Sequence, residues 1–167
     1  LARPCQYTTG ADRKNCQTRN WTQGRFSQAM VDASAQAIDQ LKVFYDASDI
    51  TLVGFSGGGA IAALVAAQRN DVTRLITVAG NIDHQRWTEL HNLSPLDESL
   101  NPPHFWKQLL NIPQLHLVGG ADRNISSEIA LSYRRHFPAS QHPPIKLIPG
   151  FDHHCCWLEQ WPELIEQ

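Results

Sequence analysis

The sequence has no apolar run that approaches the roughly 20 residues a helix needs to cross a bilayer. It also has no cluster of lysine and arginine, and its formal net charge is -2. The first absence argues against a membrane span, and the second argues against nucleic acid as a partner. No internal repeat or low-complexity linker divides the chain. With 167 residues, 42% of them apolar, residues 1–167 are expected to form one domain with its own core.

Cysteine is scarce, and its four positions include no C-x-x-C pair of the kind that binds metals. Cys5 and Cys16 lie among polar, turn-forming residues, where a disulfide would close a short loop. Such a bridge favours an extracytoplasmic location, periplasmic or secreted, although four thiols in a reduced protein would fit the sequence as well. A bond between the neighbours Cys155 and Cys156 is sterically awkward, and we do not expect it.

The strongest pattern lies in residues 49–70. Residues 50–53, with the sequence ITLV, have the β-branched and apolar composition of a buried strand. Residues 54–58 read GFSGG and satisfy G-x-S-x-G, and the alanine-rich residues 59–68 have strong helix propensity. A sharp turn between strand and helix strains its central residue and leaves no room for side chains at the flanking positions. The pattern predicts a nucleophilic Ser56 lifted clear of the sheet, with the N–H of Gly57 as one oxyanion donor.

Three further short apolar segments, residues 74–78, 115–118 and 145–148, predict strands. Helices are predicted over residues 105–110 and 126–137 and, interrupted by Pro162, over 157–165. Another helix, with Ser27 as its N-cap, is expected to cover one face of the sheet with the apolar residues Met30, Ala33, Ala37, Ile38, Leu41 and Phe44. The pattern of residues 84–112 is less regular, and this segment could form one wall of a pocket. The alternation of strand and helix indicates an α/β fold, with a mostly parallel sheet of about four strands flanked by helices.

Three of the predicted strands are followed by a serine, an acid and a histidine, namely Ser56, Asp122 and His153. Because the C-terminal ends of parallel strands lie on one edge of a sheet, these residues can converge there. Histidine would remove the serine proton, and the carboxylate would orient the imidazole and stabilise its charged form. The constellation predicts acyl transfer to water through an acyl-enzyme, a reaction that needs neither a metal nor an organic cofactor.

We call the G-x-S-x-G turn at residues 54–58 the nucleophile elbow, or elbow. This elbow and the order of the three residues resemble the α/β-hydrolase superfamily, as does the PGFDHH segment, which is similar to a Pro-Gly-x-x-His segment that ends at His153. The resemblance implies a serine hydrolase, of esterase or lipase type, with a small-molecule acyl substrate; thioesterase and peptidase activities are also compatible. It covers only the C-terminal portion of the fold, because the strands that normally precede the elbow strand and an HGGG-type oxyanion motif are not found. Since the chain also begins at Leu1 without methionine, we interpret it as incomplete. A missing N-terminal segment or another chain would then complete the sheet at the elbow strand.

The acid and the base each have a rival. Asp83 also follows a strand and is the alternative to Asp122, for which a role as a turn residue or a helix cap is the other interpretation. His154 could replace His153, because a shift of one residue in a loop reverses which ring points inward. Asp152 is expected to be a turn residue. Residues 153–156 could instead suggest zinc, but consecutive residues cannot easily close around one ion.

Two other classes of function stay open. Gly57, Gly59 and Ala62 fit a degenerate G-x-G-x-x-A fingerprint, with Asp83 placed as a ribose-binding acid, which would indicate a dinucleotide-binding protein. A non-catalytic binding or scaffold protein with a hydrolase-like shape is the second alternative.

Overall fold

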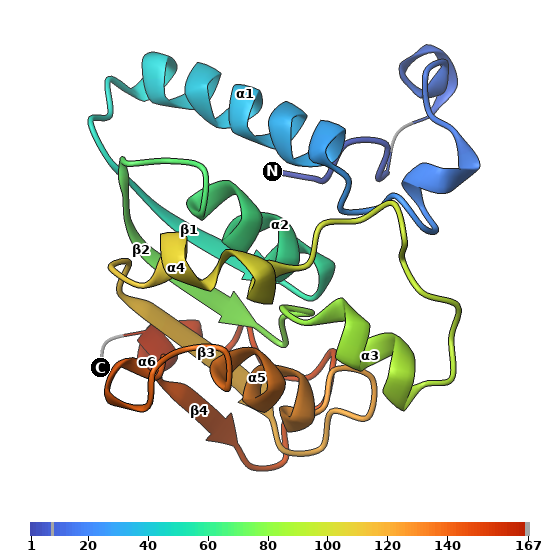
Figure 1. Ribbon diagram of the computed structural model, residues 1–167. Helices are drawn as coiled ribbons and strands as arrows, with labels where there is room; N and C mark the ends of the chain where they lie inside the picture. Colours follow the sequence, from blue (N-terminus) through green and yellow to red (C-terminus); the bar gives the residue numbers. More distant parts are fainter. Residues whose placement is uncertain (8, 166–167) are drawn as a thin grey trace.

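The computed structural model describes residues 1–7 and 9–165 (Figure 1). Its sheet has four parallel strands in the order β1-β2-β3-β4. These are β1 (Ile50–Phe55), β2 (Val72–Val78), β3 (Gln114–Gly119) and β4 (Ile145–Ile148). Spatial order therefore follows chain order, and the predicted α/β class with a parallel sheet is confirmed.

The helices are α1 (Gln28–Tyr45), α2 (Gly57–Ala66), α3 (His84–Leu90), α4 (Trp106–Leu109), α5 (Ser127–Arg134) and α6 (Trp161–Ile165). Short 3-10 helices cover Gly10–Arg13, Thr18–Asn20, Pro102–Phe105 and Ala139–Gln141. Helix α3 lies in the region expected to be irregular, and Asp83 caps it by accepting the N–H of Arg86 at 3.3 Å. Helix α6 begins four residues later than the helix expected at 157, so that Pro162 falls in its first turn, where a missing N–H is tolerated.

Side chains alternate along the strands between two apolar layers. On one side, Leu75 of β2 and Val118 of β3 pack with residues of α2, α4 and α5. On the other side, Ile76 and Leu117 pack with Trp157 and with α6. The sheet is thus covered on both faces at β2 and β3, as parallel sheets require.

Helix α1 was expected to cover the sheet, and that expectation is wrong. The helix lies across α2 instead (Figure 1), and its buried residue Val31 packs in one cluster with Ala60 and Leu64 of that helix. Leu41 and Phe44, assigned to the buried face, are 45% and 79% exposed. The reason is that α2 already occupies the sheet face at β1, so α1 forms an outer layer, and the apolar side chains near its C-terminal end are exposed.

Strand β1 is an edge of the described sheet, since it pairs with β2 alone. Leu52 and Gly54 face α2, whereas Val53 and Phe55 face the opposite side and are 49% and 46% exposed. An edge of this kind offers unpaired backbone groups to another strand. Within residues 1–7 and 9–165, no helix combines the length and apolarity needed to cross a membrane.

Both pairs of cysteines are bonded. The expected Cys5–Cys16 disulfide is present, with the two Cα atoms 5.7 Å apart, and it closes the N-terminal segment. The bond between Cys155 and Cys156, which we did not expect, is present as well. The backbone at Cys156 has a positive φ of 76°, and this tight turn brings the neighbouring sulfur atoms together where extended backbone would separate them.

Candidate active site

Ser56 stands between β1 and α2 in a backbone conformation that side chains rarely adopt, with φ 52° and ψ -124°. Three backbone hydrogen bonds hold it there. Its N–H donates to the carbonyl of Val78 at 3.0 Å, and its carbonyl accepts the N–H groups of Gly59 and Asn81, each at 2.9 Å. The strained serine is therefore fixed by β2 and by the first turn of α2.

Gly54 and Gly59 make this turn possible. A Cβ on Gly54 would lie 2.4 Å from the carbonyl oxygen of Gly58, and one on Gly59 would lie 2.8 Å from the Cα of Gly80. A Cβ on Gly58, by contrast, would meet nothing within 4 Å. The expectation that both flanking glycines are sterically required is wrong for Gly58, because its side-chain direction points into open space.

His153 lies in the loop after β4, and its ring bridges the serine and the acid. Its Nε2 is 3.0 Å from Ser56 Oγ, and its Nδ1 is 2.8 Å from Asp122 Oδ2. A carboxylate only accepts, so Nδ1–H donates to Asp122 and Nε2 is left to accept the Ser56 hydroxyl proton. The ring also lies 5.2 Å from that of Phe55, measured between centroids. The structure thus brings together the three residues that the sequence singled out.

Asp122 is held at the end of β3 by its own turn. Its Oδ1 accepts the backbone N–H groups of Asn124 and Ile125, each at 2.8 Å, while Oδ2 faces His153. The side chain of Asp122 has no exposed surface, and that of His153 is 13% exposed. Asp122 is therefore a turn residue through one oxygen, and its other oxygen contacts the imidazole of His153. Burial strengthens these hydrogen bonds by excluding water.

The rival residues do not reach the serine. Asp83 caps α3 and accepts hydrogen bonds from Asn101 Nδ2 at 2.9 Å and from the Ser132 hydroxyl at 2.6 Å. It is buried, so it is not available as a ribose-binding acid. His154 is exposed, and its backbone N–H donates to Asp152 Oδ1. Of the two acids, Asp122 is therefore the one that contacts the imidazole of His153. Of the two histidines, His153 is the one that contacts Ser56.

Residues 153–156 do not form a zinc site. The disulfide between Cys155 and Cys156 removes both thiols as ligands. No group of three or more His, Cys, Asp or Glu residues within the described chain is arranged to hold a metal ion.

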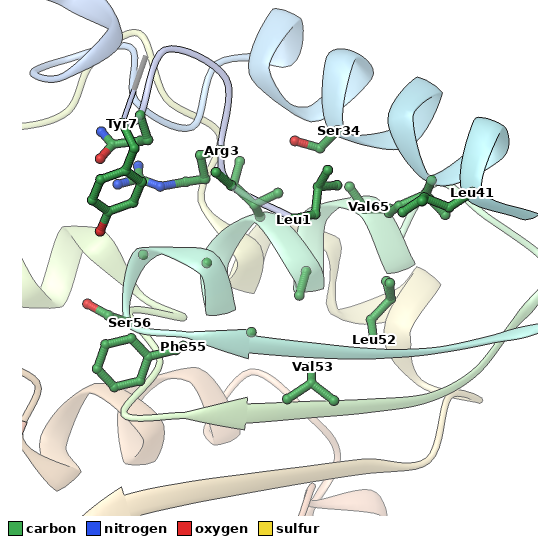
Figure 2. A pocket seen from close by; sticks show the side chains of 18 of the residues that line it. Leu1, Arg3, Tyr7, Ser34, Leu41, Leu52, Val53, Phe55, Ser56 and Val65 are labelled. Atoms are coloured by element: carbon green, nitrogen blue, oxygen red, sulfur yellow. The ribbon is translucent and has the colours of Figure 1, made fainter. Parts of the chain in front are cut away.

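A cleft of about 690 Å³ opens beside the elbow (Figure 2). One wall is β1 and the start of α2, including Ser56 and Gly57, and the other is α1 with the N-terminal segment. From that segment, Arg3 and Tyr7 extend toward the elbow above Ser56. Desolvation by burial, followed by the nearby charge of Arg25, lowers the pKa of the Arg3 guanidinium. Sequence reasoning did not find Arg3, because no local pattern marks a residue that tertiary packing brings to the site.

No protein-family model and no curated protein matches the sequence, but many solved structures match its fold. Est1E from Butyrivibrio proteoclasticus is 17% identical with a TM-score of 0.65, over 80% of this chain and 65% of that one. An alpha-beta serine hydrolase homologue from Coxiella burnetii is 20% identical with a TM-score of 0.57, over 82% of this chain and 55% of that one. A monoacylglycerol lipase from Paleococcus ferrophilus is 14% identical with a TM-score of 0.58, over 81% of this chain and 73% of that one.

The chain spans between 50% and 65% of the length of the first three structures that it matches. The similarity extends over most of this chain, and it includes all-parallel strands flanked by helices. The chain therefore has the α/β-hydrolase fold.

Proposed function

We propose that the protein is a serine hydrolase that cleaves a carboxylic ester or a related acyl bond. The observation that carries the proposal is the continuous hydrogen-bond chain from Ser56 Oγ through His153 to Asp122, at 3.0 and 2.8 Å. Distances of this kind allow a proton to pass directly between alcohol and imidazole. The structural neighbours, among them a protein named as a lipase, support hydrolysis as the class of reaction.

In this proposal, Ser56 Oγ attacks the acyl carbon while its proton passes to His153 Nε2. The imidazolium then gives that proton to the leaving alcohol as the carbon–oxygen bond breaks, which leaves an acyl-enzyme. Water attacks the acyl carbon next, with His153 again as base, and releases the carboxylic acid and free serine. Asp122 orients the ring and stabilises its positive charge throughout, without taking the proton itself.

The developing oxyanion would be stabilised by the N–H of Gly57. The first N–H groups of a helix have no acceptor within the helix, and the helix dipole favours negative charge at that end. We propose that the second donor comes from a segment that pairs with the open edge of β1, either from the same polypeptide or from another chain. The unpaired β1 edge next to Ser56 supports this location.

Labelling with a fluorophosphonate, followed by peptide mapping, tests the proposal. We expect an adduct on Ser56 that is lost in Ser56→Ala and strongly reduced in His153→Ala. His154→Ala is the matched control, because it removes a neighbouring imidazole that has no contact with Ser56 Oγ. Failure of the protein to label would contradict the proposal and favour a non-catalytic binding protein, and saturable NAD binding would favour a dinucleotide-binding one.

A further inference from the structure

Arg3 lies directly beside the first residue of α2. Its Cζ is 3.3 Å, and its Nη2 3.4 Å, from the position that a Cβ on Gly57 would take. Arg3, Ser56 and Gly57 line the same cleft, and Figure 2 shows the Arg3 side chain reaching over the start of α2 toward the serine. A positive charge is thus placed next to the proposed oxyanion donor.

No acidic side chain that the structure describes forms an ion pair with Arg3. The ion pairs of the described chain engage Arg19, Lys42, Arg69, Arg86, Arg135 and His153, but neither Arg3 nor Arg25. Instead, Arg3 lies 5.4 Å from the centre of the Phe26 ring, and Arg25 lies 5.6 Å from that of Trp87. Among the described residues, no hydrogen bond engages the N–H groups of the Arg3 guanidinium, so they can bind a planar anion, whereas the Nε–H of Arg25 already donates to the carbonyl of Thr22 at 3.0 Å.

Two like charges in this half-buried region oppose each other. The pKa of Arg3 is lowered by desolvation and by Arg25, and the pKa of Arg25 is lowered by desolvation. Arginine stays protonated despite such shifts. Desolvation and the repulsion between the two charges therefore make the electrostatic energy of the folded protein less favourable. A bound anion would remove this cost, and a carboxylate matches the paired N–H groups of one guanidinium.

We propose that Arg3 forms an anion-binding subsite beside Ser56, and that the preferred substrate carries a carboxylate on its acyl chain. The acyl side is favoured because Arg3 adjoins Gly57, whose N–H would face the acyl oxygen. This inference rests on the proposed hydrolase function for its substrate, but the subsite itself requires no turnover.

Two esters of equal length test the substrate preference, 4-nitrophenyl hexanoate and the mono-4-nitrophenyl ester of adipate, which replaces the terminal methyl with a carboxylate. We expect a higher kcat/KM for the adipate ester. Arg3→Gln should lower the ratio of adipate to hexanoate kcat/KM by about tenfold to a hundredfold, the range for a hydrogen-bonded charged pair. Arg3→Lys keeps the charge without the fork and should give an intermediate ratio.

Arg13→Gln is the matched control. It removes one positive charge from the same N-terminal segment, where Arg13 is exposed and lies 4.7 Å from the centre of the Trp21 ring, outside the cleft. The ratio should not change in this variant. An Arg3→Gln enzyme that loses activity equally on both esters would overturn the subsite and indicate a role at the oxyanion or in the elbow.

Adipate itself provides a test that does not depend on hydrolysis. Isothermal titration calorimetry should show saturable binding of adipate to the protein, weakened about tenfold or more by Arg3→Gln and unchanged by Arg13→Gln. If neither ester is hydrolysed, the proposed function fails while this titration still decides on the subsite. Equal adipate binding by all three proteins, or none, would refute the anion subsite even if the esters are cleaved.

Discussion

Gly54 and Gly58 occupy equivalent places in the G-x-S-x-G pattern, but their surroundings differ. The carbonyl of Gly58 fills the space that a Cβ on Gly54 would need, at 2.4 Å, whereas Gly58 has no neighbour within 4 Å in that direction. We therefore expect Gly54→Ala to lower the free energy of unfolding by about 1–3 kcal/mol through overpacking, and to displace Ser56. Urea denaturation measures the first effect, and fluorophosphonate labelling the second.

Gly58→Ala serves as the control for the same chemical change. It lies within α2, so alanine should stabilise the helix by up to about 1 kcal/mol. Equal losses of stability in the two variants would contradict the steric argument and show that the motif requires both glycines.

His116 is fully buried on β3, at the centre of a polar cluster. Its Nδ1 is 2.8 Å from the Thr77 hydroxyl, its Nε2 is 3.2 Å from Gln114 Oε1, and Tyr133 donates to that same oxygen at 2.7 Å. A neutral ring satisfies this arrangement by accepting at Nδ1 and donating at Nε2. Burial disfavours the charged ring and lowers the pKa of His116 to about 3.

Stability should consequently fall as the solution becomes more acidic. Below the ordinary histidine pKa of about 6.5, the unfolded chain binds a proton at residue 116. The folded protein does not bind this proton until the pH falls to about 3. Between pH 7 and 5 this effect reaches at most about 2 kcal/mol. Urea denaturation of the wild-type protein and His116→Gln at both pH values measures it; parallel pH dependences in the two proteins would contradict the assignment.

At the scale of elements, the loop after β4 is the part that positions the imidazole. Asp152 Oδ1 accepts the N–H groups of His154 and Cys155 at 2.8 and 2.6 Å, and its carbonyl accepts the indole N–H of Trp157 at 3.0 Å. The same two backbone hydrogen bonds, that of Cys155 first, lower the pKa of the exposed Asp152 carboxyl. Asp152 is thus the turn residue that the sequence predicts.

Removing this acceptor should disturb His153 through the backbone. We expect Asp152→Ala to reduce kcat severalfold, because the loop loses the hydrogen bonds that fix the ring next to Ser56. Asp152→Asn retains an acceptor oxygen and should keep most of the activity. Steady-state kinetics of both variants provides the measurement, and an equal reduction in both would instead indicate that the negative charge matters.

The two disulfides make a prediction that is independent of activity. The described chain has no free cysteine, since Cys5 pairs with Cys16 and Cys155 with Cys156. Thiol titration of the denatured, unreduced protein should therefore find no reactive thiol, and reduction should release four. Two thiols before reduction would show that one of the bonds does not form.

The sequence predicts the strands and the three residues at their ends because those signals are local. Short, mostly apolar runs stop at glycine in residues 50–54 and 115–119, and Ser56 and Asp122 follow within a few residues. Arg3 and the partners of α1 are different, because they depend on which segments meet in space. Helix α3 was missed since its seven residues carry too little apolar periodicity, and the Cys155–Cys156 bond was missed since it depends on a positive φ.

For the whole molecule, we expect the unpaired edge of β1 in the described sheet to determine whether the protein self-associates. Val53 and Phe55 are both about half exposed, and β1 has a partner on one edge only within the described residues. We expect residues 1–167 expressed by themselves to self-associate as concentration rises, and Val53→Glu to reduce this, because charge on an open strand opposes pairing. Sedimentation velocity over a range of concentrations provides the measurement.

Gln36→Glu is the control for the added charge. Gln36 is exposed on α1 and is not one of the exposed apolar residues, so this variant should associate as the unmodified chain does. A monomer at every concentration would contradict the expectation.

Ser56 and His153, the proposed nucleophile and base, are attached to opposite margins of the described sheet, since Ser56 follows β1 and His153 follows β4. Strand β4 is four residues long and, within the described residues, pairs with β3 as its only neighbouring strand. Short outer strands detach before the interior of a protein unfolds. On gentle warming we expect turnover to cease while the helical circular dichroism signal persists, so that an activity assay reports the fraying of one outer strand and not the melting of the domain.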